Sequence, residues 1–358
     1  MTEDPFAGRP RRLRLGLPRD PASGRYLTGF FVVTVTTVLL VRGLLAATGY
    51  PQVGGAGLHV AHVLWGGLAM ALAVIVLLSF VGPTARPLAA VLAGIGFGLF
   101  VDEVGKFVTS DNDYFFAPTA AIVYVVVVAL VLVAEALHGR REHHPSEYLA
   151  GAVDRAAAGI AGGFTARARA EARHLAERGS GAPGAEEVAA LVDAVVDDDA
   201  ELVDPVAALG SRVQGVARRM LAARRLPWVL LALTALTVGA ETVLGLLANE
   251  GVTRWVAVGL LASSALVLVA MVLAGAAALR GEATAAWDWL YRGTLVGLLL
   301  VQVCAFRALS WPAAGGAVVL LAVYVLADQA RDGVGADDVG HRRTAGERTV
   351  SRGRPEVR

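Results

Sequence analysis

The chain has 358 residues, 56% of them hydrophobic, and its formal net charge of +1 gives no basic excess for binding nucleic acid. Its single cysteine, Cys304, excludes an internal disulfide and a metal centre built from several cysteines. The hydrophobic residues come in long blocks, which excludes an ordinary soluble domain, where they are scattered in amphipathic patterns.

Eight apolar blocks approach the length of a membrane-spanning helix, which is about 20 residues for a hydrocarbon core about 30 Å thick. The first block follows an Arg-rich segment, but it is longer than the apolar part of a signal peptide, about 7–15 residues, so we expect it to span the membrane. The predicted helices cover 27–48, 58–81, 87–108, 116–137, 228–249, 254–279, 287–308 and 312–328. The sequence therefore predicts an all-α membrane protein with about eight transmembrane helices.

The chain divides into five predicted regions. These are an Arg-rich N-terminal segment at 1–26, helices one to four at 27–138, a helical insert at 139–226, helices five to eight at 227–328 and a disordered tail at 329–358. Residues 43–49 and 245–251 match at five of seven positions, which suggests two four-helix halves in parallel repeat.

The arginines predict the orientation, because short cytoplasmic loops of membrane proteins carry the excess of Arg and Lys. With eight spans, the Arg clusters that flank the helices fall on one side, whereas the opposite loops 49–57 and 109–115 contain neither residue. We therefore expect a bacterial plasma-membrane protein with both termini in the cytoplasm and membrane lipids as its surroundings. Protein partners cannot be named from the sequence.

The insert is Ala-rich, with predicted breaks at Gly179–Gly184 and near Pro205. Its charges are segregated into an acidic stretch at 186–204 and a basic one at 212–225. One interpretation is a small helical hairpin with solvated charged faces. The alternative is a regulatory element whose basic helix lies on anionic lipid.

Charged and imidazole side chains inside spans are the candidate functional residues, because each costs about 2.5–3.5 kcal/mol to insert. They cluster in the first three helices and in the outer layer of the membrane, and they are Arg42, His59, His62, Asp102, Glu103 and Lys106. Asp102 is expected roughly 9–10 Å below the outer end of its helix, at 1.5 Å per residue.

Small and polar residues form stripes on two of these helices. Gly94, Gly98, Asp102 and Lys106 recur every four residues, and a similar stripe on the preceding helix includes Gly66. Because small residues let membrane helices approach closely, we expect the two stripes to face each other. Lys106, the only lysine of the chain, is spaced to bridge Asp102 and Glu103.

These residues permit three kinds of site. The polar group, with Asp111 and Asp113 at the outer mouth, suits an ion, a proton or a small polar ligand. His59, His62 and Asp102 suit a divalent metal, the only cofactor that the sequence suggests. Asp102, Glu103 and Lys106 equally suit a structural ion-pair lock.

One further acid, Glu241, lies near the middle of the fifth predicted helix. We expect it to pair with Arg42 or to line the same cavity, because an acid at that depth needs a polar partner.

The run GFGLFVDEVGKFV at 96–108, followed by DNDYFF at 111–116, resembles a motif of uncharacterised bacterial polytopic membrane proteins. The upstream His-x-x-His at 59–62 belongs to the same resemblance, which spans about sixty residues. It implies a multi-pass membrane protein and carries no activity.

Three functional hypotheses remain open. The leading one is a plasma-membrane binding or transport protein with its site in the outer half of the membrane. The second is a membrane metalloenzyme that acts on a lipid or its head group at the outer leaflet. The third is a structural or sensory protein whose polar layer is an ion-pair lock, so whether the chain is an enzyme stays open.

Overall fold

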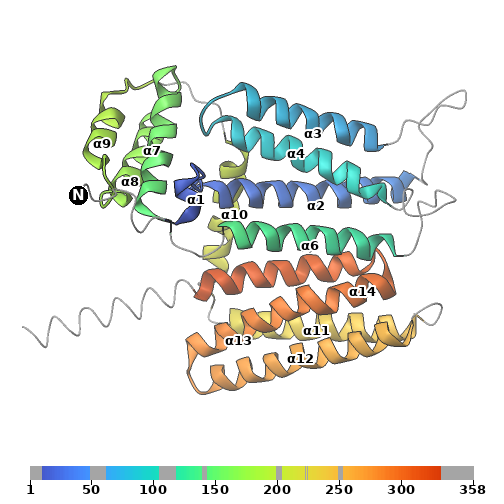
Figure 1. Ribbon diagram of the computed structural model, residues 1–358. Helices are drawn as coiled ribbons and strands as arrows, with labels where there is room; N and C mark the ends of the chain where they lie inside the picture. The colour runs from blue at the N-terminus through green and yellow to red at the C-terminus, as the bar shows by residue number, and fades with distance from the viewer. Residues whose placement is uncertain are drawn as a thin grey trace, which may run out of the picture. The chain divides into compact units, whose positions relative to one another are not determined.

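The computed structural model describes residues 10–48, 62–104, 118–138, 143–198, 204–221, 223, 225–248 and 253–331. Within them every regular element is a helix, and eight helices are long and apolar enough to cross a membrane, which confirms the predicted fold class (Figure 1). They are α2 (Ser23–Thr48), α3 (His62–Ser79), α4 (Ala85–Asp102), α6 (Thr119–His138), α11 (Leu226–Leu247), α12 (Arg254–Leu279), Ala283–Leu309 and Ala313–Arg331.

The seventh span is not a uniform α-helix. It consists of α13 (Ala283–Val296), a π-helical segment η1 (Gly297–Val301) and α14 (Gln302–Leu309). A π-helical segment inserts one residue into an otherwise α-helical turn, and such insertions are frequent at functional sites.

The chain forms two compact units. The first comprises Met1–Tyr114 and Ala129–Arg212, and the second comprises Phe115–Val128 and Val213–Arg358. The two parts of α6 therefore belong to different units.

In the first unit, α4 packs against α2 on one side and α3 on the other (Figure 1). Gly94 and Gly98 face α2, since a methyl group added there would lie 2.8 Å from Val33 and 2.7 Å from Thr37. Gly96 lies on the opposite face, where an added methyl group would be 2.7 Å from the carbonyl oxygen of Gly66 in α3. Residues two apart on a helix point about 200° apart, so alternating glycines give α4 two close contacts.

This arrangement corrects the predicted facing of the stripes. The stripe of Gly94, Gly98 and Asp102 faces α2 rather than α3, and Gly66 of α3 instead meets Gly96. The spacing of four identified a close-packed face correctly, but it could not say which neighbouring helix that face meets.

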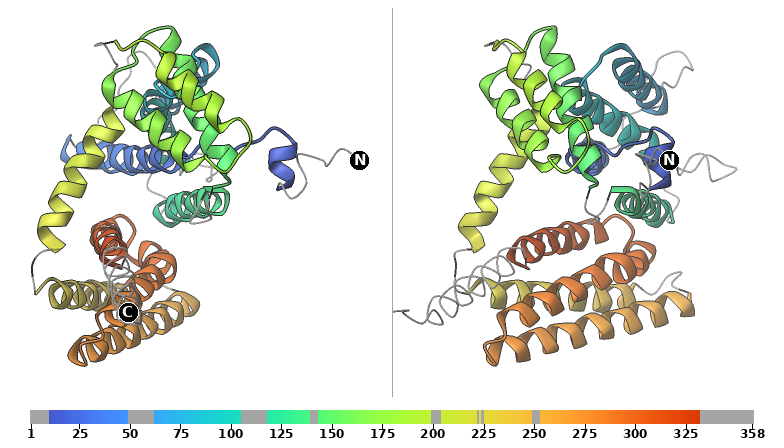
Figure 2. Two further views of the ribbon diagram at one scale, coloured as in Figure 1. Left: turned by 90° about the vertical axis from the view of Figure 1, so that its left-hand side faces the viewer. Right: turned by 60° about the vertical axis from the view of Figure 1, so that its left-hand side comes forward.

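The second unit has an apolar core supplied by α11, α12, the Ala283–Leu309 span and the last helix, together with the first turn of α6. Val238, Leu260, Val267, Leu320 and Val323 are fully buried in it. Figure 2 shows α11 to α14 and the last helix side by side. Its interior is mainly apolar, so a polar side chain buried there needs a hydrogen-bond partner.

The insert is helical, with α7 (Pro145–Ile160), α8 (Ala166–Arg178), α9 (Ala185–Ala194) and α10 (Pro205–Leu221) (Figure 2). The predicted breaks at Gly179–Gly184 and at Pro205 are confirmed. Helices α7, α8 and α9 share a small core, so this part is a three-helix cluster rather than a hairpin. The extra break lies at Gly162 and Gly163, whose φ angles of 126° and 72° suit glycine.

Candidate functional site

The centre of the predicted polar layer is a buried ion pair between two spans. Arg42 of α2 donates from Nε to Oδ1 of Asp102 at 2.6 Å, and from Nη2 to the backbone oxygen of Asp102 at 2.9 Å. Asp102 is fully buried and Arg42 is 8% exposed. In an apolar interior, a charge pair of this kind fixes the relative position of two helices strongly, because separating it leaves each charge uncompensated.

Glu103 is fully buried as well, but it has a different partner. Its Oε2 accepts a hydrogen bond of 2.7 Å from the backbone N–H of Val63, in the first turn of α3. A carboxylate in this place satisfies one of the free N–H groups of a helix N-terminus and interacts favourably with the helix dipole. The charged group therefore joins α2, α3 and α4 at one end of the first unit.

The predicted helix over 87–108 is interrupted beside Asp102. Helix α4 ends at Asp102, with Glu103 as its C-cap, rather than continuing unbroken to residue 108. The two acids thus lie at the end of α4, where carbonyl groups lose their intrahelical partners. The backbone oxygen of Asp102 accordingly accepts from Arg42.

Half of the predicted site residues can be placed in the structure. Arg42, Asp102 and Glu103 are joined through α4, and His62, which is partly exposed, is the first residue of α3 and precedes Val63. His59, Lys106, Asp111 and Asp113 lie outside the described residues.

The proposed metal set is only partly visible. Within the described ranges, no three His, Cys, Asp or Glu side chains come together in a way that would hold a metal ion. Of the three predicted ligands, His62 and Asp102 are described and His59 is not. Asp102 also uses Oδ1 for Arg42, which leaves that oxygen less available to a metal.

A second buried acid lies in the second unit. Glu241 of α11 is 6% exposed, and both of its carboxylate oxygens accept from Nε2 of Gln302 in α14, at 2.9 and 2.8 Å. The expectation that Glu241 pairs with Arg42 is therefore wrong. Gln302 was not among the residues predicted from the sequence, because only ionisable side chains were taken as candidates. A buried amide inside a span also needs a hydrogen-bond partner.

Hydroxyl groups line the same helices. Thr242, next to Glu241, lies 2.7 Å from the hydroxyl of Ser264 in α12, and it also bonds to the carbonyl oxygen of Val238. These are neutral contacts that tie α11 to α12 without involving the carboxylate.

A third group of charges joins the insert to the N-terminal segment. Glu147 of α7 is fully buried and accepts from Arg19 at 3.0 Å, from Arg12 at 3.3 Å and from the backbone N–H of His144 at 2.8 Å. Burial alone would raise the pKa of Glu147, but these hydrogen bonds, above all those from Arg19, outweigh it and lower the pKa to about 2. The sequence analysis did not single out Glu147, since nothing local distinguishes it from a solvated acid.

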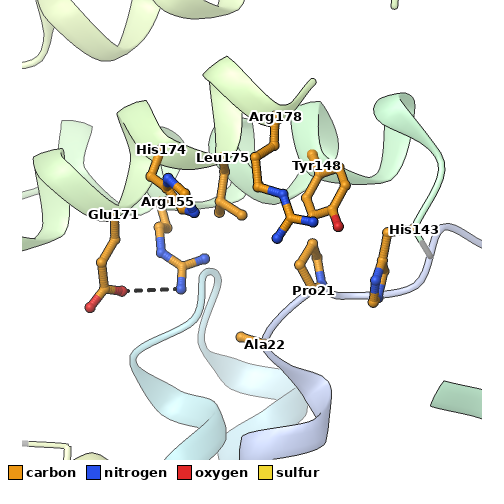
Figure 3. A pocket seen from close by; sticks show the side chains of 9 residues that line it. All are labelled: Pro21, Ala22, His143, Tyr148, Arg155, Glu171, His174, Leu175 and Arg178. Carbon is orange, nitrogen blue, oxygen red and sulfur yellow. Dashed lines mark hydrogen bonds and ion pairs between the residues drawn. The ribbon is translucent and has the colours of Figure 1, made fainter. Parts of the chain in front are cut away.

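Beside this group lies a cleft of about 400 Å³ between the start of α2 and helices α7 and α8 (Figure 3). Its lining residues are Pro21, Ala22, His143, Tyr148, Arg155, Glu171, His174, Leu175 and Arg178. Arg155 pairs with Glu171 at 3.3 Å, and the guanidinium of Arg178 lies 4.3 Å from the centre of the Tyr148 ring. Two guanidinium groups against one carboxylate make the lining more basic than acidic.

His143 lies at one end of this cleft. Its Nε2 is buried and has no hydrogen-bond partner among the described residues. Burial, with the nearby charge of Arg19, lowers the pKa of His143, so its imidazole is neutral near pH 7. The lining of the cleft therefore combines a neutral imidazole with two guanidinium groups.

Comparison with known proteins gives no family: no family model, no curated protein and no solved structure matches the chain. The resemblance to bacterial polytopic membrane proteins is supported only in the number of apolar helices. By the length and hydropathy of those eight helices, the chain is a multi-pass membrane protein.

Proposed function

We propose that this chain is a membrane binding or transport protein whose polar layer binds a proton or a small cation. The observation that carries the proposal is the burial of three charged side chains in one unit: Arg42 lies inside an apolar span, and Asp102 and Glu103 lie at the end of another. Ionisable groups are rare at such depths and are typical of ion and proton pathways.

The proposed orientation follows the arginines, with both termini in the cytoplasm of a bacterial cell. In this orientation the polar layer faces the outer side of the plasma membrane, so the ligand would enter from there. His59, His62, Lys106, Asp111 and Asp113 are proposed to complete the path on the strength of the sequence alone.

The carboxylates are the groups that would bind the ligand. Glu103 accepts from the N–H of Val63 through Oε2, which holds its carboxylate at the start of α3. Asp102 is held by Arg42, and a cation that binds Asp102 would have to compete with this ion pair.

The test is ion flux through the purified full-length protein in liposomes, followed with an entrapped pH dye for protons and with radioactive Na⁺ for cations. Glu103→Gln retains an acceptor for Val63 but removes the charge, and the double variant Arg42→Leu, Asp102→Leu removes the pair without leaving an isolated charge. Glu187→Gln, an exposed acid of α9, is the matched control.

We expect flux above that of empty liposomes, at least a tenfold loss in Glu103→Gln and in the double variant, and wild-type flux in the control. If neither ion crosses, or if both variants conduct as well as the wild type while remaining folded, the proposal is wrong and the layer is an ion-pair lock.

A separate experiment tests the metalloenzyme hypothesis. Elemental analysis of the purified protein should find a stoichiometric divalent metal that is lost in His59→Ala and in His62→Ala. No observation on the described residues favours it over the transport proposal.

A further inference from the structure

Glu241 and Gln302 form a pair that is enclosed in the second unit. Glu241 is 6% exposed and Gln302 is fully buried, and the amide donates to both carboxylate oxygens. Among the described residues no Arg, Lys or His forms an ion pair with Glu241. An ionised carboxylate in the membrane interior is expensive without a cation, so this side chain needs either a counter-ion or a proton.

The carboxylate is held in place by the last helix as well. A methyl group added at Gly316 would overlap the carboxylate of Glu241, so the acid fills the space where any other residue would put its side chain. Glycine at 316 makes room for the carboxylate, and the hydrogen bonds that the structure gives to Glu241 come from Gln302.

The oxygen of the Gln302 amide does not take part in the contact with Glu241. Oε1 of Gln302 is buried and has no hydrogen-bond donor among the described residues. A buried acceptor without a donor costs about 1–3 kcal/mol. The missing donor has an obvious source, because a protonated carboxyl group carries one O–H.

An acid and an amide can then form two hydrogen bonds. The N–H of Gln302 would donate to the carbonyl oxygen of Glu241, and the O–H of Glu241 would donate to Oε1 of Gln302 after a rotation of the amide about its terminal bond. When the proton leaves, Nε2 returns to both carboxylate oxygens, as the structure has it. Gln302 is thus a suitable partner for both forms of the acid.

The π-helical segment places Gln302 for this role. The backbone N–H of Gln302 bonds to the carbonyl oxygen of Gly297, five residues earlier, instead of to that of Leu298. The carbonyl oxygen of Leu298 accepts from the hydroxyl of Tyr124, whose ring also stacks on Phe306 at 4.7 Å. Tyr124 therefore satisfies the group that the π turn leaves free.

We propose that Glu241 is a proton-binding site of the second unit, with Gln302 as its hydrogen-bond partner in the protonated and in the ionised form. This site consists of residues of the second unit, and the inference goes beyond the proposed function. The proton comes from solvent and returns to it, and no other bond is made or broken.

Infrared difference spectroscopy on the full-length protein in lipid tests the proposal. Spectra taken between about pH 5 and about pH 9 should contain the C=O stretching band of a protonated carboxyl group that is replaced by carboxylate bands as pH rises. The band should be lost in Glu241→Gln and retained in Glu282→Gln, an exposed acid between two spans.

Two further measurements make the assignment specific. Gln302→Met removes both hydrogen-bonding atoms of the amide, so the band should shift in frequency while Glu241 is still present. Added NaCl at constant pH should leave the band unchanged.

Absence of any band that depends on Glu241 across this range would overturn the proposal. Loss of the band on addition of Na⁺ would overturn it too, in favour of a cation as the occupant. Neither result depends on ion flux through the polar layer, so failure here and failure of the proposed function can be told apart.

Discussion

Asp102 and Glu103 are neighbours in the chain, yet their fully buried carboxylates bind different helices: Asp102 accepts from Arg42 of α2, and Glu103 accepts from the N–H of Val63 in α3. The two side chains reach different helices because α4 ends between them. Asp102 is the last residue of α4, whereas Glu103 is the C-cap and lies outside the regular helix. One short sequence thereby ties three spans together, and each tie can be tested separately.

The Arg42–Asp102 pair should behave as a unit. Asp102→Asn removes the carboxylate charge that pairs with the buried guanidinium, so we expect a loss of about 3–5 kcal/mol in the free energy of unfolding. The double variant Arg42→Leu, Asp102→Leu should recover most of this loss, since neither charge is then left alone. Denaturant unfolding in detergent, followed by tryptophan fluorescence, measures both. Equal destabilisation by the single and double variants would show that the two side chains are not coupled.

Glu103 should stabilise the start of α3. Glu103→Ala leaves the N–H of Val63 without its acceptor, and we expect a cost of about 1–3 kcal/mol. Glu103→Gln keeps an acceptor and loses only the charge at the helix N-terminus, worth about 0.3–1 kcal/mol. Hydrogen exchange at the first turn of α3 reports the difference directly. Unchanged exchange in Glu103→Ala would contradict the assigned contact.

Glu147 should make the stability of the first unit depend on acid pH. Its pKa is about 2 in the folded chain, whereas a glutamate in an unfolded chain has a pKa of about 4.3. Below that value the unfolded state binds more protons, so the stabilisation is complete above about pH 5 and is lost as pH falls towards about 2.

The matched comparison is with Glu147→Gln, which should lower the unfolding temperature at neutral pH. The gap between the two proteins should close as pH falls through this range. Glu187→Gln, on the exposed face of α9, should follow the wild type at every pH. A gap that does not depend on pH would mean that the charge of Glu147 is not what stabilises the contact.

Gly66 and Gly67 offer a paired test of helix packing. A methyl group at Gly66 would lie 2.6 Å from the carbonyl oxygen of Gly96, and backbone atoms cannot move aside cheaply, whereas one at Gly67 meets nothing within 4 Å. We expect Gly66→Ala to cost about 1–3 kcal/mol through overpacking. Gly67→Ala should be neutral or gain up to about 1 kcal/mol, since alanine favours the helix. Similar thermal stability of the two variants would show that α3 and α4 are further apart.

The spans were predictable from the sequence because a block of about 20 apolar residues has few alternatives in a bilayer. The sixth prediction, 254–279, coincides with α12, and the others differ from the structure by a few residues at their ends, except where α4 ends early at Asp102. The early end escaped detection because Val104 and Gly105 continue an apolar pattern that says nothing about capping.

The partners of the buried charges were harder to foresee. Spacing placed Arg42 and Asp102 at a common depth, and the structure joins them. Their positions in the predicted spans did not exclude Glu241 as the partner of Arg42, since depth alone does not specify the neighbouring helix. Gln302 and Glu147 were missed because an uncharged amide and a surface-like acid give no local signal, and their roles come from residues 61 and 128 positions away.

The π turn at Gly297–Val301 sets the angular register of everything that follows it in the seventh span. One residue more or less turns a helix by about 100°, so deleting a single residue there would restore ordinary winding and swing the amide of Gln302 away from the acid. The extra residue of the π turn thus determines the direction in which the Gln302 side chain points. The hydrogen bond from the hydroxyl of Tyr124 to the carbonyl oxygen of Leu298 stabilises the turn.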